Sequence, residues 1–266
     1  MALPSLAPLC RPVPARGEGV CPVCHGCPHA GYPTCWSCAT VLAQVTHPCR
    51  QVVPISLYAI PGELHGTLRR YKDGRCQGRK GHDLHAVGEL LARFLERHQA
   101  CVTDGACGFD LLTTVPSSAR RPGPHPLARA VGTDPWLAAR YRRTLVAGDA
   151  SLGHARASDH GFELCCAVDG ARVVLLDDTL TTGARAQSAA SALQSHGAVV
   201  LAIVVVGRVV DPGHSPLARS WWYRHAMAPF DLDRCCLEDP TMARPGQARE
   251  PPAPAQEYGV ASPITA

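Results

Sequence analysis

The clearest helical pattern of the chain lies between Asp83 and His98. Apolar side chains recur there at intervals of three and four residues, at Leu84, Val87, Leu90, Leu91, Phe94 and Leu95. This spacing places one apolar stripe along a helix. A short apolar run from Leu111 to Val115 then predicts a strand, which ends at Pro116. This part of the chain therefore predicts a helix followed by a strand.

The stretch between residues 117 and 161 has weaker patterns. Residues 117–126 are rich in Arg, Pro and Gly, which predicts a loop. Residues 127–141 predict a helix that breaks at Pro135. Residues 144–161 contain glycines and histidines without periodicity, so we expect a second loop.

A strand–loop–helix–strand unit follows. Its members are a buried aliphatic strand at Arg172–Leu176, a polar turn at Asp177–Gly183, a helix at Ala184–Ser195 and a second buried strand at Ala198–Val206. Gly197 is a typical stop signal for the helix between the two strands. Strands that alternate with helices in this way indicate an α/β domain with a parallel sheet.

Composition limits the class of protein. The chain has 266 residues, of which 46% are hydrophobic and 18% charged, so it can form a sizeable core and is too apolar to be disordered. Its longest apolar run, Ala198–Val206, is about half the roughly 18 residues that a membrane helix needs. The first residues contain prolines and do not resemble a signal peptide. We therefore expect a cytoplasmic protein without membrane insertion, and the net charge of +4 is too small to indicate a nucleic-acid partner by itself.

The turn after the first strand of this unit carries the strongest functional signal. Asp177 and Asp178 follow a buried strand, and ligands of open α/β sheets bind at that edge. The N-terminus of the following helix favours a phosphate, to which Thr179, Thr181 and Thr182 can add hydroxyl donors. Carboxylates suit sugar hydroxyls, which donate hydrogen bonds. The pattern predicts a ribose 5-phosphate site, and the alternative is an Asp-Asp-Thr turn that only caps a helix.

The cysteines indicate a metal site near the N-terminus. The chain has 14 cysteines, and two C-x₂-C pairs, Cys21–Cys24 and Cys35–Cys38, are separated by ten residues. Four thiolates with this spacing suit a structural, tetrahedral zinc ion without an open coordination position. A nearby His25, Cys27 or His29 as a ligand, a redox dithiol and an iron–sulfur cluster remain alternatives. The pairs Cys165–Cys166 and Cys235–Cys236 lack such spacing and are interpreted as buried thiols.

Two motifs together resemble a known family. The run from Val173 to Gly183 closely resembles the phosphoribosyl pyrophosphate (PRPP) motif of type I phosphoribosyltransferases. With the cysteine pairs ahead of it, the chain is similar to the ComF family, phosphoribosyltransferase-like proteins associated with bacterial competence. The resemblance covers roughly residues 20–210, and further similar segments are Tyr58, Gly62–Glu63–Leu64, Leu68–Arg69–Arg70–Tyr71–Lys72 and Val115–Pro116.

The resemblance implies a fold and a set of site residues. The expected fold is α/β, a type I phosphoribosyltransferase-like parallel sheet flanked by helices, with a small N-terminal four-cysteine zinc module. The expected layout is a flexible N-terminus (1–20), the zinc module (21–50), the phosphoribosyltransferase-like domain (51–237) and a disordered Pro-rich tail (238–266). The catalytic pair Asp177 and Asp178 would hold the ribose hydroxyls, and the PRPP 5′-phosphate would bind at Thr179, Leu180, Thr181, Thr182 and Gly183.

The pyrophosphate loop departs from the family pattern. The family usually has an Arg-Gly-Phe-Asn-Gln run, where this chain reads Arg120-Arg121-Pro122-Gly123-Pro124-His125-Pro126. Arg120 and Arg121 can still bind pyrophosphate through their guanidinium groups, although the prolines remove backbone donors.

The implied activity is phosphoribosyl transfer. A phosphoribosyl group would pass from Mg²⁺-bound PRPP, or a related phosphorylated ribose, to a nitrogen nucleophile, with release of pyrophosphate. The alternative is a catalytically inactive, zinc-containing nucleotide-binding or scaffold protein of competence and DNA uptake. Its partners would be DNA-uptake proteins or single-stranded DNA.

Overall fold

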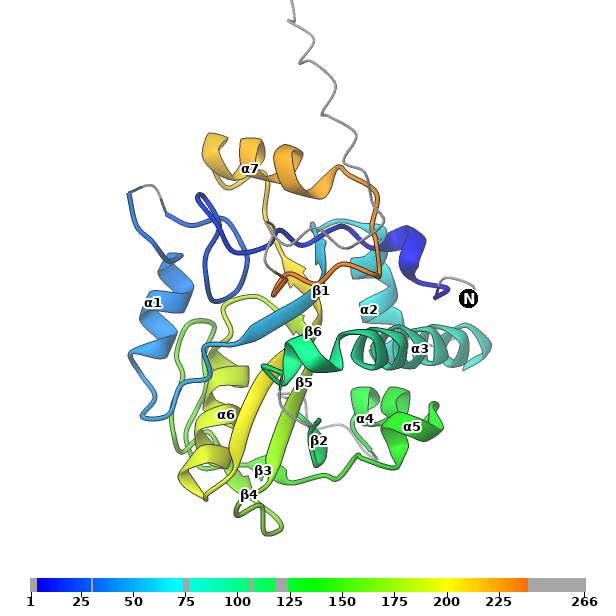
Figure 1. Cartoon of the computed structure of the whole chain (residues 1–266), viewed down its shortest axis with the longest axis vertical. Coiled ribbons are helices and arrows are strands. Elements are labelled where there is room, and N and C mark those ends of the chain that lie inside the picture. The colour runs from blue at the N-terminus through cyan, green and yellow to red at the C-terminus, as the bar shows by residue number, and fades with distance from the viewer. Residues whose placement is uncertain (1–3, 30, 74–76, 106–107, 118–123, 239–266) are drawn as a thin grey trace, which may run out of the picture.

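The protein is an α/β structure built on a parallel sheet (Figure 1). The computed structural model describes residues 4–29, 31–73, 77–105, 108–117 and 124–238. Within these ranges, four parallel strands form the main sheet in the order β1 (Val52–Tyr58), β6 (Val199–Val209), β5 (Arg172–Leu180) and β2 (Leu111–Thr114). Two shorter strands, β3 (Leu145–Ala147) and β4 (Phe162–Leu164), form a separate antiparallel pair.

Helices cover both faces of the main sheet (Figure 1). One face carries α2 (Glu63–Asp73), α3 (Gln77–Val102), α4 (Pro126–Val131) and α5 (Pro135–Ala138), and the other carries α1 (Trp36–Leu42) and α6 (Ala184–Ser195). The remaining helices are α7 (Pro216–Ala226) and a short 3-10 helix, η1 (Ala7–Leu9). None of the helices in the described ranges is long and apolar enough to cross a membrane.

Successive side chains of β5 point to opposite faces of the sheet, and each face has its own hydrophobic cluster. Val174 and Leu176 pack with residues of α2, α3 and α4. Val173 and Leu175 pack on the opposite face, with α6 and with the cysteines of the two C-x₂-C pairs. Because side chains alternate along a strand, the next residues after Leu176 continue to different faces of the sheet.

The strand–helix–strand unit forms as its sequence predicts, with one difference. Helix α6 has the predicted bounds, and β6 overlaps the predicted second strand. Strand β5 continues to Leu180 instead of ending at Leu176, because Asp177 and Thr179 pair with Val205 and Gly207 of β6. The predicted polar turn is therefore shorter, and the acidic pair lies inside the strand.

The other predicted helices are correct in type but differ in extent, and one expected loop contains a strand. The periodic stretch 83–98 is the central part of the longer α3, and residues 127–141 contain two short helices, the second of which begins at Pro135. The expected loop 144–161 begins with β3. Arg120, Arg121 and residues 239–266 of the expected tail lie outside the described residues.

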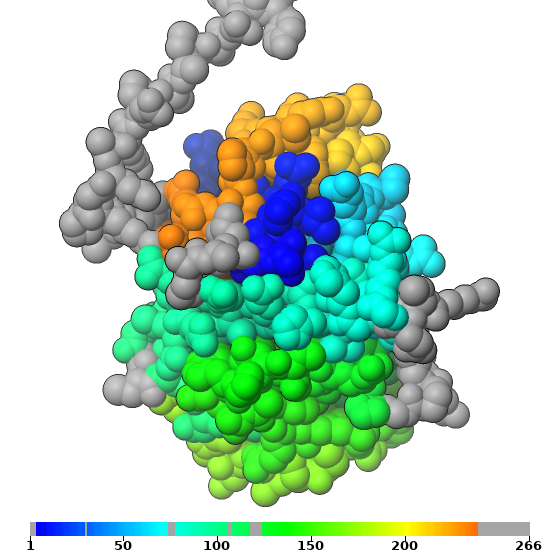
Figure 2. All heavy atoms as spheres, turned by 90° about the vertical axis from the view of Figure 1, so that its right-hand side faces the viewer, coloured from blue at the N-terminus to red at the C-terminus, as the bar shows by residue number. Residues whose placement is uncertain are grey.

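The N-terminal segment packs against the domain, although the sequence favours a flexible segment there. Leu6 and Cys10 are buried in the core on the α3 side of the sheet. Arg11 pairs with Leu57 of β1 in an antiparallel bridge, and Gly19 accepts a 2.7 Å hydrogen bond from Trp221 Nε1. Figure 2 shows the segment in dark blue, lying between the α3 surface and the C-terminal residues in orange.

Candidate functional site

Asp178 is held by two side chains of α2. Its carboxylate accepts a hydrogen bond from Tyr71 Oη, and its Oδ1 lies 2.7 Å from Lys72 Nζ. Asp178 is 4% exposed, whereas the Lys72 side chain keeps 25% of its surface. A buried charge needs a partner of this kind. The last turn of α2 therefore neutralises the second member of the acidic pair.

Asp177 lies on the other side of β5 and is half-buried. Its Oδ1 accepts a 2.9 Å hydrogen bond from the Asp178 backbone N–H. Burial and the neighbouring Asp178 charge raise the pKa of Asp177 to about 7, although Lys72 and Arg185 act in the opposite direction. Raised carboxyl pKa values of this kind are common at functional sites. Asp177 is the member of the pair with more accessible surface and less compensated charge.

The turn from β5 into α6 is shaped for close approach of a ligand. Gly183 has a φ of +84°, a left-handed conformation that favours glycine, and it precedes the first residue of α6. The N–H groups of the first turn of a helix have no partner within the helix and favour an anion. Thr181 is exposed at this turn. The 181–183 turn thus places backbone donors at the end of β5, the strand that carries Asp177.

Two of the predicted hydroxyl groups have partners within the protein. Thr182 Oγ1 donates to the backbone carbonyl of His154, and Thr179 Oγ1 lies 3.3 Å from Tyr58 Oη, at the end of β1. An added Cβ at Gly207 would lie 2.6 Å from the Tyr58 ring, so this glycine of β6 leaves room for Tyr58. Strands β1, β5 and β6 therefore meet at the same edge through side-chain contacts.

Arg185 connects the start of α6 to the end of β2. Its Nη2 donates to the carbonyl of Pro116, and its guanidinium lies 5.3 Å from the centre of the Phe162 ring. Burial lowers the pKa of Arg185, and the charge of Asp177 counteracts this effect. Arg185 thus places a positive charge on the Asp177 side of the sheet.

The two C-x₂-C pairs come together in one buried group, here called the four-cysteine cluster (Cys21, Cys24, Cys35 and Cys38). Their sulfur atoms all lie within 4.8 Å of one another. The Sγ atoms of Cys24 and Cys35 are 3.7 Å apart, close to the edge of about 3.8 Å in a tetrahedron with Zn–S bonds of about 2.3 Å. Backbone N–H groups of Cys35 and Cys38 also donate to cysteine sulfurs at 3.4 Å. The cluster can hold a metal ion such as zinc.

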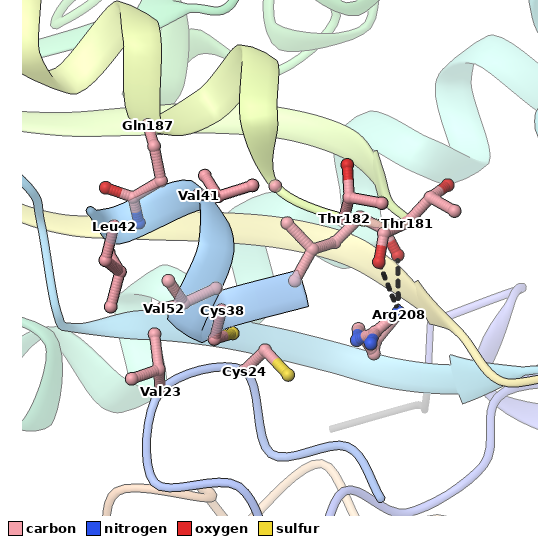
Figure 3. Close-up of a pocket in the computed structure, with 12 residues that line it drawn as sticks. Val23, Cys24, Cys38, Val41, Leu42, Val52, Thr181, Thr182, Gln187 and Arg208 are labelled. Carbon is pink, nitrogen blue, oxygen red and sulfur yellow. Dashed lines mark hydrogen bonds between the residues drawn. The ribbon is translucent and has the colours of Figure 1, made fainter. Parts of the chain in front are cut away.

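Arg208 of β6 lies between this cluster and the 181–183 turn (Figure 3). Its Nη1 donates to the carbonyl oxygens of Thr181 at 2.7 Å, Val209 at 2.6 Å and Leu180 at 3.2 Å. Its buried Nε has no hydrogen-bond partner among the described residues. Hydrogen bonds from Cys21, Cys35 and Cys38 lower the pKa of Cys24, and the Arg208 charge lowers it further. Arg208 therefore provides positive charge beside the four-cysteine cluster.

A narrow crevice separates the cluster from the turn. Its lining includes Cys24, Cys38, Val41, Thr181, Gln187 and Arg208 (Figure 3). The space for solvent is about 10 Å³, which is about the volume that one water molecule needs. A nucleotide therefore does not fit into this crevice.

Several of these residues were missed by sequence reasoning as site residues. Arg185 lies two residues after Gly183, whereas four others come from distant parts of the chain: Tyr58, Tyr71, Lys72 and Arg208. The resemblance included the segment with Tyr71 and Lys72 but did not indicate their contact with Asp178. The predicted pyrophosphate residues Arg120 and Arg121 lie outside the described residues.

Comparison of the chain with known proteins does not assign a family. No protein-family model matches the sequence, and no curated protein matches it.

Proposed function

We propose that the chain binds PRPP, or a related phosphorylated ribose, at the C-terminal edge of its parallel sheet and transfers the phosphoribosyl group to a nitrogen nucleophile. The observation that carries this proposal is the half-buried Asp177, whose charge acts on Arg185 in the first turn of α6, the helix that follows the left-handed Gly183. A carboxylate suited to sugar hydroxyls and backbone donors suited to a phosphate thus belong to one strand–turn–helix unit. The resemblance of residues 173–183 to the PRPP motif supports the same ligand.

The two aspartates have different roles in this proposal. Asp177 accepts hydrogen bonds from the ribose hydroxyls, because it is the more accessible of the two. Asp178 is a positioning residue that holds Lys72 through the 2.7 Å ion pair. The 5′-phosphate lies on the 181–183 turn and the first N–H groups of α6, which carry partial positive charge.

The proposed reaction breaks the bond between ribose C1 and the pyrophosphate oxygen and forms a bond between C1 and nitrogen. The leaving electron pair goes to pyrophosphate, and C1 develops positive charge. Asp177 then contributes by orienting the ribose, and catalysis depends mainly on positioning and electrostatics. Mg²⁺ bound to the substrate would neutralise part of the pyrophosphate charge. Arg120 and Arg121 follow β2 in the chain and are the proposed pyrophosphate contacts.

The four-cysteine cluster has a structural role in this proposal. Four buried thiolates fill the coordination shell of a zinc ion, so no position is left for a substrate. Its part in the site is indirect, through Arg208 and the carbonyl oxygens of the turn.

Calorimetric titration of the full chain with PRPP and Mg²⁺ tests the proposal. Wild type should bind saturably, and Asp177→Asn should bind at least about tenfold more weakly, since one charged hydrogen-bond acceptor of about 1.5–3 kcal/mol is lost. Asp169→Asn is the matched control, because Asp169 is exposed and precedes the start of β5, at the opposite edge of the sheet. Absence of binding to a folded, zinc-containing wild type would overturn the proposal.

A further inference from the structure

A second group of metal-ligand side chains lies at the end of α3. Nδ1 or Nε2 of His98 and the Sγ atoms of Cys101 and Cys235 lie within 4.8 Å of one another. His98 and Cys235 are buried, and Cys101 is half-buried. None of the three belongs to the four-cysteine cluster or to the edge around Asp177. His98 and Cys101 are three residues apart on α3, which puts them on one side of the helix.

The hydrogen bonds of His98 determine which ring nitrogen faces the two thiols. Its Nε2 lies 2.7 Å from the carbonyl oxygen of Leu232. Because a carbonyl only accepts, Nε2 carries the proton and Nδ1 keeps its lone pair. Nδ1 is 4.0 Å from Cys101 Sγ and 3.8 Å from Glu238 Oε1. Metal-binding histidines usually donate their other ring N–H to a carbonyl or carboxylate in this way.

The backbone also deviates at this position. His98 has a φ of −114° and a ψ of +20°, outside the helical range, within the otherwise helical α3. The ring of Phe94 packs against the His98 ring, with centres 4.7 Å apart. Packing and hydrogen bonding together hold the imidazole in place, as a preorganised ligand requires.

We propose that His98, Cys101 and Cys235 form a second metal site, with Glu238 as fourth ligand, for a borderline-soft divalent cation such as Zn²⁺. Two thiolates, an imidazole and a carboxylate match the donors that zinc takes. Ligand bonds of about 2.0–2.3 Å put tetrahedral ligands about 3.3–3.8 Å apart, so the separations among His98, Cys101 and Cys235 must shrink by about 1 Å at most. Glu238 Oε1 lies 3.8 Å from His98 Nδ1, and its carboxylate must move toward the two thiolates when the metal binds. The site is independent of the proposed ribose site.

The metal fastens the C-terminal segment to α3. Two ligands come from α3 and two from residues 235–238, and an ion pair of 2.7 Å between Arg97 Nε and Asp233 Oδ1 lies beside them. Phe230, Leu232 and Leu237 pack on the same core, next to the N-terminal segment. Closing the chain between residues 98 and 235 stabilises the folded state by restricting the unfolded one.

Metal analysis of the full chain tests this site. Purified wild type should hold two zinc ions per chain, and Cys235→Ser should hold one. Cys165→Ser is the matched control and should keep two, because Cys165 is exposed and belongs to neither cluster. In the Co²⁺-loaded protein, Cys235→Ser should remove the thiolate charge-transfer bands of a two-sulfur site and leave those of the four-sulfur site.

If Cys235→Ser does not fold, a more conservative substitution of a proposed ligand can test the site instead. Glu238→Gln should fold and weaken Zn²⁺ binding at the second site by about tenfold or more, with binding at the first site unchanged. One zinc per reduced wild-type chain, bound by the four-cysteine cluster alone, would overturn the proposal. A disulfide between Cys101 and Cys235, seen as a mass loss of two hydrogens and without zinc uptake after reduction, would also overturn it.

Discussion

At the scale of single residues, Asp177 and Asp178 show how adjacent carboxyl groups acquire different properties. Asp178 faces α2, where Lys72 and Tyr71 satisfy it. Asp177 faces the α6 side and has no ion pair of comparable distance among the described residues. Burial and the Asp178 charge therefore raise its pKa to about 7. The end of β5 therefore carries one carboxylate paired with a lysine, Asp178, and one without such a close ion pair among the described residues, Asp177.

This difference predicts opposite effects of two substitutions on stability. The raised pKa of Asp177 means that its stabilising contribution is complete below the ordinary value of 3.8 and is lost as the pH rises to about 7. Asp177→Asn, which resembles the protonated form, should therefore raise the free energy of unfolding at pH 8 by about 1–3 kcal/mol. Asp178→Asn should lower it by about 1–3 kcal/mol, because it removes the partner of Lys72.

Urea unfolding at pH 5.5 and at pH 8 measures both effects. The gain from Asp177→Asn should be larger at pH 8, where the wild-type carboxyl is ionised. An equal gain at the two pH values would show that Asp177 does not titrate between them.

Among the elements, helices α3 and α4 can pack closely because α3 has a glycine, Gly88, at their contact. Gly88 of α3 faces α4, and an added Cβ would lie 2.3 Å from both the Ala130 carbonyl oxygen and Thr133 Oγ1. Such contact with backbone is relieved only by moving α4. Gly81 lies on the same helix, and an added Cβ there would have no neighbour within 4 Å. The two glycines thus differ in packing although they share a helix.

Alanine substitutions should separate helix propensity from packing. Gly81→Ala should stabilise the protein by up to about 1 kcal/mol, because alanine favours the helix. Gly88→Ala has the same propensity gain, but overpacking should make it destabilising by about 1–3 kcal/mol. Thermal unfolding of the two variants beside wild type measures this contrast. Similar stability changes in both would contradict the close α3–α4 packing.

In the molecule as a whole, Arg208 connects the four-cysteine cluster to the proposed ligand site. Its guanidinium lies beside the sulfurs of the four-cysteine cluster and donates to carbonyl oxygens of the 181–183 turn and of Leu180. The cysteines also pack with β5 and α6 in one core. The four-cysteine cluster is therefore part of the main domain's core, and the buried charge of Arg208 lies between it and the turn.

Removing the hydrogen bonds from Arg208 to the 181–183 turn should make this turn more dynamic. Arg208→Met should keep the metal content and increase amide hydrogen exchange at residues 181–183, because their carbonyl contacts are lost. Removal of the metal by a chelator should have a larger effect, since it also releases the cysteines from the core. Arg219→Met is the control, because Arg219 is exposed on α7. Unchanged exchange at 181–183 in both treatments would show that the cluster and the turn are uncoupled.

The elements with strong local patterns could be predicted from the sequence. The β5–α6–β6 unit and the centre of α3 have apolar periodicity that depends on near neighbours alone, and the two C-x₂-C pairs have their ligand spacing within 18 residues. Strand β1 is buried along its whole length and contains Pro54, which is unusual in a strand and is tolerated here at the sheet edge. Because of this proline, the local sequence pattern does not predict β1 as a strand.

The local sequence is enough to group the residues of the strand end and the two pairs of thiols. The surroundings of these residues depend on tertiary packing. Tyr71 and Lys72 contact Asp178 across more than 100 residues of chain, and His98 meets Cys235 across a similar separation. Contacts of this length depend on how helices pack on the sheet, and no local spacing encodes that packing. The raised pKa of Asp177 and the proposed second metal site therefore depend on the folded chain.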